Sequence, residues 1–158
     1  MPDPFLTDAQ RDEIAEHAGH YPEKRAASVD ALKIVQRDHG WVPDAAMPEI
    51  AELLDVGVAE LEGVATFYNL IYRRPVGRHV IHVCDSISCH VMDGELVMTK
   101  LKDRLGIEPG QTTDDGRFTL LPICCLGNCD HAPTLLVGRD LHNDVEPAKL
   151  GELLEQYE

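Results

Sequence analysis

Four of the five cysteines fall into two short-spaced pairs, and this spacing constrains the chain more than any other feature. Cys84 and Cys89 enclose four residues, Cys125 and Cys129 enclose three, and 35 residues separate the two pairs. Each short loop can bring two thiolates to one metal while its backbone N–H groups point inward. Four such thiolates are what a 2Fe-2S cluster needs. We therefore expect the chain to fold around a metal centre built from two loops.

Spacing alone leaves two other chemistries open. Four cysteines in two pairs also suit a structural tetrahedral zinc site, because the ligand spacings that zinc tolerates overlap with those found here. A dithiol redox pair is the weaker alternative, because the sequence contains no Cys-x-x-Cys motif.

Cys124 stands directly before Cys125, so either residue could serve as the ligand. We assign Cys125, because it forms the compact Cys-Leu-Gly-Asn-Cys loop, in which Gly127 lets the backbone approach closely. Cys124 is then expected to be a small buried apolar residue.

His90 and His131 each lie within two residues of a ligand cysteine, but four cysteines already fill the two irons. We assign no ligand role to these histidines.

Charge and composition limit the partners of the chain. Lys and Arg total 14 against 28 Asp and Glu, and the net charge of −14 opposes close approach to phosphates. No apolar stretch approaches the roughly 20 residues needed to cross a bilayer, and the first ten residues carry no leader-like apolar region. We expect no nucleic-acid partner, no direct membrane insertion and a cytoplasmic location.

A composition shift near residues 73–78 divides the chain into a helix-patterned first part and a strand-containing second part. We expect a helical N-terminal region over 1–72, a linker over 73–78 and an α/β domain over 79–158. In the first part, a capping box of Thr7 and Gln10 opens a helix that ends at Gly19. A second helix is predicted over 22–40. A third helix is predicted to begin after Asp44, which would cap it, and a fourth to cover 58–65.

The second part is predicted to form a small mixed sheet with helices. A buried strand over 79–83 delivers Cys84 at its end, and a later helix ends at Gly106. Asp115 and Gly116 indicate a turn before a strand over 118–121. Two short strands, over 134–137 and near residue 141, and a final helix after Pro147 complete the prediction.

Three sequence motifs resemble a known family: Cys-Asp-Ser-Ile-Ser-Cys-His-Val, Cys-Cys-Leu-Gly-Asn-Cys-Asp-His-Ala-Pro and, upstream, Ala-Thr-Phe-Tyr-Asn-Leu. They are similar to the small iron–sulfur subunit, the E subunit, of bacterial NADH:quinone oxidoreductase, respiratory complex I. The similarity runs over nearly the whole chain. It implies a helical N-terminal region followed by a thioredoxin-like 2Fe-2S ferredoxin domain, with Cys84 and Cys89 on one iron and Cys125 and Cys129 on the other. Many relatives place an acidic residue where this chain has Cys124.

The resemblance also implies a function. The chain is expected to be an electron-transfer subunit with one 2Fe-2S cluster, to have no complete active site of its own, and to accept single electrons from a larger flavoprotein that binds FMN and NADH. Other peripheral-arm subunits are further expected partners, and the complex is expected at the cytoplasmic face of the inner membrane. The alternatives are the equivalent subunit of an NAD-linked hydrogenase or formate dehydrogenase, and a zinc-stabilised interaction module.

No catalytic residue is predicted on this chain, because it lacks a Gly-rich dinucleotide fingerprint and any local catalytic motif. Arg73, Arg74 and Arg78 form the one local basic cluster in an acidic chain, and we expect them to dock an acidic surface of the partner. The apolar and aromatic residues beside them are candidates either for the same contact or for packing between the chain's own two parts. They are Phe67, Tyr68, Ile71 and Tyr72.

Overall fold

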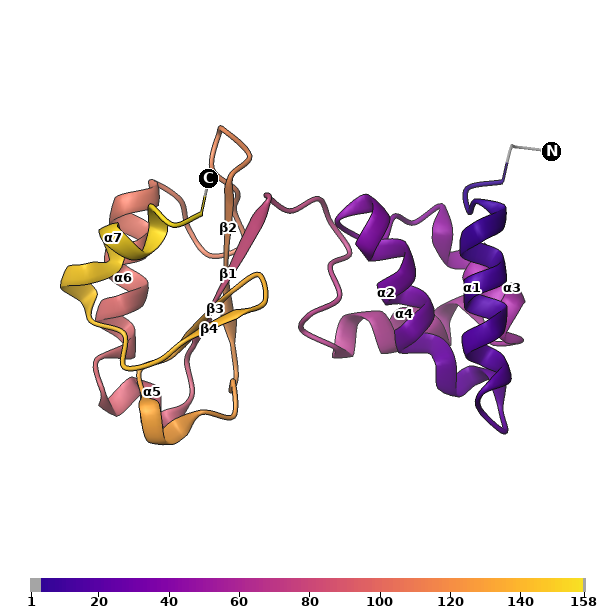
Figure 1. The fold of residues 1–158 in the computed structure, drawn as a ribbon, viewed down its shortest axis with the longest axis horizontal. Coiled ribbons are helices and arrows are strands. Elements are labelled where there is room, and N and C mark those ends of the chain that lie inside the picture. The colour runs from indigo at the N-terminus through magenta and orange to yellow at the C-terminus, as the bar shows by residue number, and fades with distance from the viewer. Residues whose placement is uncertain (1–3, 158) are drawn as a thin grey trace. The chain divides into compact units, whose positions relative to one another are not determined.

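A computed structural model describes residues 4–157, so the first three residues of the acidic start and Glu158 lie outside the described part. The chain divides into two compact units, residues 1–75 and 76–158 (Figure 1). Each unit has a hydrophobic core of its own. None of the helices within residues 4–157 is both long and apolar enough to cross a membrane.

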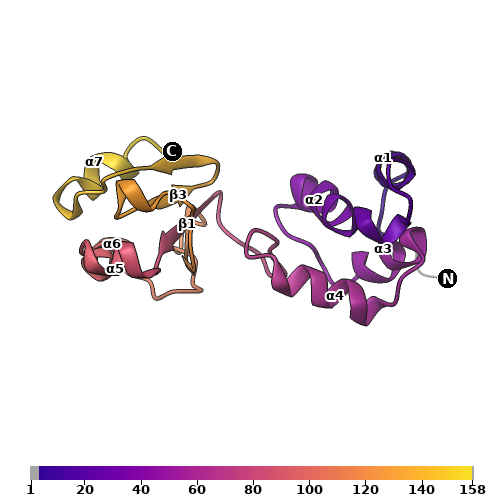
Figure 2. The ribbon, with the colours of Figure 1, turned by 90° about the horizontal axis from the view of Figure 1, so that it is seen from below.

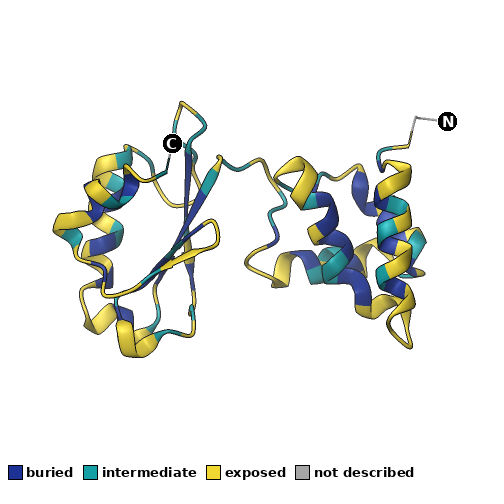
Figure 3. Ribbon diagram, in the orientation of Figure 1, coloured by how far each residue is buried: buried dark blue, intermediate teal, exposed yellow. Residues whose placement is uncertain are grey.

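Over its described residues, 4–75, the first unit is a bundle of four α-helices. They are α1 (Asp8–Gly19), α2 (Ser28–His39), α3 (Ala46–Leu54) and α4 (Val58–Phe67), with a 3-10 turn at Lys24–Ala27 before α2. The faces that the helices turn toward one another are buried (Figure 3). Ile14, Leu32, Ile50 and Leu61 are fully buried there, one from each helix.

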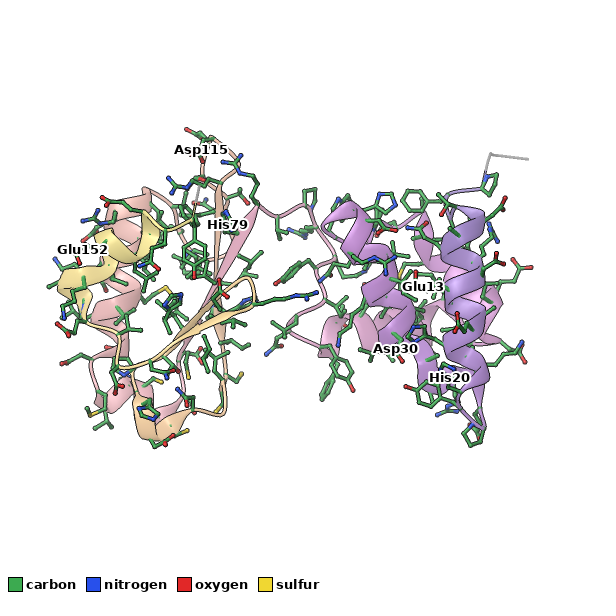
Figure 4. All side chains as sticks on the ribbon, in the orientation of Figure 1. Glu13, His20, Asp30, His79, Asp115 and Glu152 are labelled. Carbon is green, nitrogen blue, oxygen red and sulfur yellow. The ribbon has the colours of Figure 1, made fainter. Side chains whose placement is uncertain are left out.

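Local sequence signals set the ends of these helices. The Thr7 hydroxyl accepts a hydrogen bond from the Gln10 N–H at 3.2 Å, and the Gln10 side chain accepts one from the Thr7 N–H at 3.0 Å. The predicted capping box is therefore confirmed. Gly40 ends α2 with a φ of 79°, as its sequence position predicts. On α1, Glu13 (labelled in Figure 4) pairs with Arg37 of α2 at 2.7 Å.

Two predicted helix starts are wrong. The second helix was expected from Pro22, but a 3-10 turn intervenes and the α-helix begins at Ser28, whose hydroxyl donates to the Arg25 carbonyl at 2.6 Å. Proline fixes φ but supplies no side-chain acceptor for the first N–H groups. Asp44 does not cap α3, which begins after Ala45, because its carboxylate pairs with Arg73 instead.

The second unit is built on a four-stranded mixed sheet, as predicted. Its strands are β1 (His79–Cys84), β2 (Phe118–Ile123), β3 (Leu135–Val137) and β4 (Asp140–His142), in the order β2-β1-β3-β4. β1 runs parallel to β2 and antiparallel to β3, and β3 and β4 form a hairpin. Asp115 (labelled in Figure 4) makes the predicted turn before β2, where it accepts the Arg117 N–H at 2.9 Å.

Helices cover one face of this sheet. They are α6 (Gly94–Leu105) and α7 (Leu150–Leu154), and the short helix α5 (Ile87–Val91) precedes them (Figures 1 and 2). Ile81, Leu120 and Leu135 of the strands and Leu101 of α6 are completely buried between the two layers.

Parallel pairing decides the location of the cysteine loops. Cys84, the last residue of β1, lies opposite Ile123, the last residue of β2. Because the two strands are parallel, the segments that follow them leave the same end of the sheet. Two loops that lie far apart in the sequence are thereby brought together.

Candidate metal centre

Both cysteine loops lie at one end of the sheet. Cys84 ends β1 and Cys89 lies on α5, whereas Cys125 follows β2 and Cys129 begins a 3-10 turn at Cys129–His131. Cys84 and Cys89 pack with Ile123 and Ala132 in one small buried cluster, with Leu126 of the second loop against it. The structure therefore brings the two predicted loops into contact.

The first loop buries its cysteines. Cys84 is 3% exposed and Cys89 is 2% exposed. Burial raises the pKa of the Cys84 thiol, while hydrogen bonds from the backbone N–H groups of Ser86 and Leu126 act in the opposite direction. The Leu126 N–H comes from the second loop, so the two loops meet at the Cys84 sulfur. Cys89 Sγ lies 3.6 Å from Thr134 Oγ1, just before β3.

The second loop exposes its cysteines. Cys125 and Cys129 are both accessible at the surface. The Gly127 N–H donates to Cys125 Sγ at 3.3 Å, and the φ of Gly127 is 74°, which a side chain would strain. The compact turn that the Cys-Leu-Gly-Asn-Cys sequence predicts is therefore present, with a backbone N–H directed at a sulfur.

Helix α5 was not predicted, because the residues between Cys84 and Cys89 were expected to form a loop. Ile87 and Val91 stand four residues apart on one helical face, which normally indicates a buried stripe. Here they are 72% and 70% exposed, and Cys89 between them faces the interior. Met92, just after the helix, is also exposed. An apolar surface therefore lies directly beside a predicted ligand.

The donor set fits a cluster of two irons. Four thiols come from two adjoining loops, and three backbone N–H groups, those of Ser86, Leu126 and Gly127, donate to their sulfurs. Hydrogen bonds of this kind are typical around iron–sulfur clusters. Among residues 4–157, no three His, Cys, Asp or Glu side chains gather around one point as ligands of a single metal ion.

Three further residues of the cysteine motifs, Cys124, His90 and His131, are exposed. Cys124 is exposed, so the expectation of a small buried residue is wrong; β2 ends at Ile123, and the chain turns outward after it. His90 Nδ1 lies 3.3 Å from a carboxylate oxygen of Glu95, and His131 Nδ1 lies 3.1 Å from one of Asp144. Both rings therefore already have a partner within the chain.

Arg73 serves the fold of the first unit, in contrast to the docking role predicted for it. Its guanidinium pairs with Asp44 at 2.7 Å and with Glu62 at 2.9 Å, and it donates to the carbonyl of Val42. The side chain is only 16% exposed. These contacts tie the end of the unit to α4 and to the loop before α3. Arg74 next to it is exposed.

Replacement of Arg73 by alanine is expected to lower the free energy of unfolding by about 1–3 kcal/mol, because it removes a donor to a carbonyl and both ion pairs. Arg74→Ala is the matched control and should change it by less than about 0.5 kcal/mol. Urea unfolding of the two variants, followed by circular dichroism, measures the difference. Equal stabilities would refute the structural role of Arg73.

The mixed sheet, its helical layer and the cysteine loops at the ends of β1 and β2 define a class of small α/β proteins with a thioredoxin-like fold. The chain belongs to the thioredoxin-like [2Fe-2S] ferredoxin family, whose model matches residues 14–158. It is 53% identical to the E subunit of NADH-quinone oxidoreductase from Pseudomonas aeruginosa and 51% identical to that from Escherichia coli K12. Both matches cover 96% of this chain and 92% of the relative. The predicted resemblance and fold class are confirmed.

The same fold occurs in a solved structure of a different enzyme. The crystal structure of an NAD+-reducing [NiFe]-hydrogenase in the air-oxidised state matches with a TM-score of 0.69 at 24% sequence identity. The match covers 82% of this chain and only 22% of the hydrogenase chain. This likeness concerns the fold.

Proposed function

We propose that this chain is the 2Fe-2S electron-transfer subunit of an NADH-quinone oxidoreductase. The observation that carries the proposal is its 53% identity, over 96% of its length, to the E subunit of such an enzyme. The two adjoining cysteine loops support it, because they supply the thiol set that such a cluster needs. The chain is then one part of an oxidoreductase and relies on other subunits for substrate chemistry.

Cys84 and Cys89 are proposed to hold one iron, and Cys125 and Cys129 the other. A bound 2Fe-2S cluster exchanges one electron at a time. The chain keeps water from the Cys84 and Cys89 side by burying both thiols. The N–H groups of Leu126 and Gly127 stabilise negative charge on sulfur, which raises the reduction potential relative to bare thiolates.

The electron donor is proposed to be a larger partner subunit that carries FMN and binds NADH. The exposed apolar side chains of Ile87 and Val91 adjoin buried Cys89, so a partner that covers them comes close to the cluster. Exposed acidic residues, Asp93 and Glu95, border this surface and favour a basic rim on the partner. Through such subunits the chain would sit in the peripheral arm, at the cytoplasmic face of the membrane.

The related hydrogenase role has weaker support. Its likeness to this chain is a likeness of fold at 24% identity, whereas the E subunits from Pseudomonas aeruginosa and Escherichia coli are 53% and 51% identical in sequence. We therefore favour the NADH-quinone oxidoreductase as the parent enzyme.

Anaerobically purified chain tests the cluster through visible absorption, metal analysis and EPR after dithionite reduction. The proposal expects a brown protein with about two irons per chain and a rhombic S = 1/2 signal on reduction. Colourless protein with one zinc would overturn the electron-transfer function and leave a structural module. Recovery of the chain with an FMN-binding, NADH-oxidising subunit from its own cells tests the partner.

A further inference from the structure

The two cysteine loops are held in different ways. Cys84 and Cys89 are buried and packed, so the core fixes their side chains. Cys125 and Cys129 are exposed and lie outside that packed cluster. A ligand on an exposed loop is held more firmly where contacts from outside the loop restrain its backbone. The contacts of the residues that flank Cys129 identify that restraint.

A short segment after β4, residues 143–145, lies against the second cysteine loop, and we call it the bracket. Its last residue, Val145, is 6% exposed and belongs to the core between the sheet and the helices. The Val145 N–H donates to the Pro133 carbonyl at 2.9 Å. The bracket is therefore anchored in the core and reaches outward to the loop.

The bracket contacts the loop on both sides of Cys129. Before the cysteine, Asn128 Nδ2 donates to Asn143 Oδ1 at 2.7 Å. After it, the Asp144 N–H donates to the His131 carbonyl at 2.8 Å, and the Asp144 carboxylate lies 3.1 Å from His131 Nδ1. Together with the hydrogen bond of Val145, these contacts join the bracket to residues 128, 131 and 133. Among them, only the contact between the Asp144 carboxylate and the His131 ring depends on charge.

We propose that Asn143 is a positioning residue that, through Asn128, holds Cys129 in place for the cluster. The proposal rests on the ligand set of the proposed function. The bracket side chains bind Asn128 and His131, so they act on the geometry of the loop and add no ligand. Loss of the bracket contact leaves all four thiols present but frees the backbone around Cys129. The cluster is then released faster and samples a wider range of geometries.

Two substitutions of Asn143 separate positioning from a general effect on the fold. Asn143→Leu removes the acceptor for Asn128, whereas Asn143→Asp keeps an acceptor oxygen at nearly the same place. With an iron chelator present, the visible absorption of the Asn143→Leu chain should decay roughly two- to tenfold faster than that of the wild type. Its EPR signal should broaden. Asn143→Asp should match the wild type in both the decay rate and the EPR signal. The wild type and the two variants should show the same thermal unfolding when they are free of metal.

Asp144→Gly provides a second variant that preserves the backbone. Asp144 has a φ of 49°, which glycine adopts without strain, so the change removes the side chain without forcing the backbone to move. Asp144 is 67% exposed and His131 is 49% exposed, and an ion pair this open contributes little. Decay should therefore be at most about twofold faster than in the wild type.

The outcomes distinguish the bracket from the cluster itself. If the wild-type chain binds iron but Asn143→Leu and Asn143→Asp lose it at the wild-type rate, with an unchanged EPR signal, the bracket has no positioning role. Equal acceleration by both Asn143 variants would also refute it, because the acceptor would not matter. A wild-type chain that binds no iron would refute the proposed function, and the bracket with it.

Discussion

Replacement of Cys125 by alanine is expected to reduce the iron content from about two per chain to nearly none. The cluster would be left with three thiolates, because the two cysteines of the first loop would already bind the other iron and Cys124 lies outside the compact Cys125–Cys129 loop. Cys125 Sγ also accepts a hydrogen bond from the Gly127 N–H at 3.3 Å, and this bond stabilises negative charge on the sulfur. Iron analysis and visible absorption of the anaerobically purified variant measure the loss.

Cys124 provides the control, because it is the neighbouring residue and is also exposed. Cys124→Ala should keep the iron, the colour and the EPR signal of the wild type. A colourless Cys124→Ala together with a brown Cys125→Ala would reverse the assignment. Loss of colour in both variants would mean that this stretch tolerates no change, and Cys129→Ala would then be needed to test the second loop.

Local signals explain most of the elements that the sequence predicted. The capping box at Thr7 and the left-handed glycines after α2 and α6 each depend on residues within one helical turn. A single sequence carries such information in full. The end of β1 at Cys84 is also local, because an apolar run stops there. The predicted loops could therefore be placed at the ends of strands before the sheet order was known.

Contacts between distant residues explain what the sequence did not predict. Arg73 and Asp44 lie 29 residues apart, and no local pattern indicates that they pair or that Asp44 is thereby lost as a cap. The hydrogen bond from Asn128 to Asn143 spans 15 residues and involves two ordinary polar side chains. At α5 the expected loop is a short helix, and its apolar side chains Ile87 and Val91 are exposed. An apolar pair at helical spacing normally indicates a buried face, so its exposure could not be read from the sequence.

Gly94→Ala is expected to displace the proposed ligand Cys89, although the substitution replaces no cysteine. Gly94 is buried at the start of α6, and a Cβ there would lie 2.6 Å from the carbonyl oxygen of Cys89 and 2.9 Å from its carbonyl carbon. Both are backbone atoms, so no side chain can swing aside, and α5 or α6 must move. Forced overpacking of this kind costs about 1–3 kcal/mol. Because the clash is with the backbone of Cys89, the variant should hold the cluster less tightly and should also be less stable.

Gly63→Ala is the matched control, since Gly63 also lies in a helix, α4, and a Cβ there would meet nothing within 4 Å. That change should stabilise the first unit by up to about 1 kcal/mol, because alanine favours the helix over glycine, and should leave the iron content unchanged. Gly94→Ala should lose iron to a chelator faster than both the control and the wild type. Retention of iron at the wild-type rate would mean that α5 moves freely past α6, and that Cys89 keeps its place through its own packing against Ile123 and Ala132. The close approach at Gly94 would then be a feature of the fold alone.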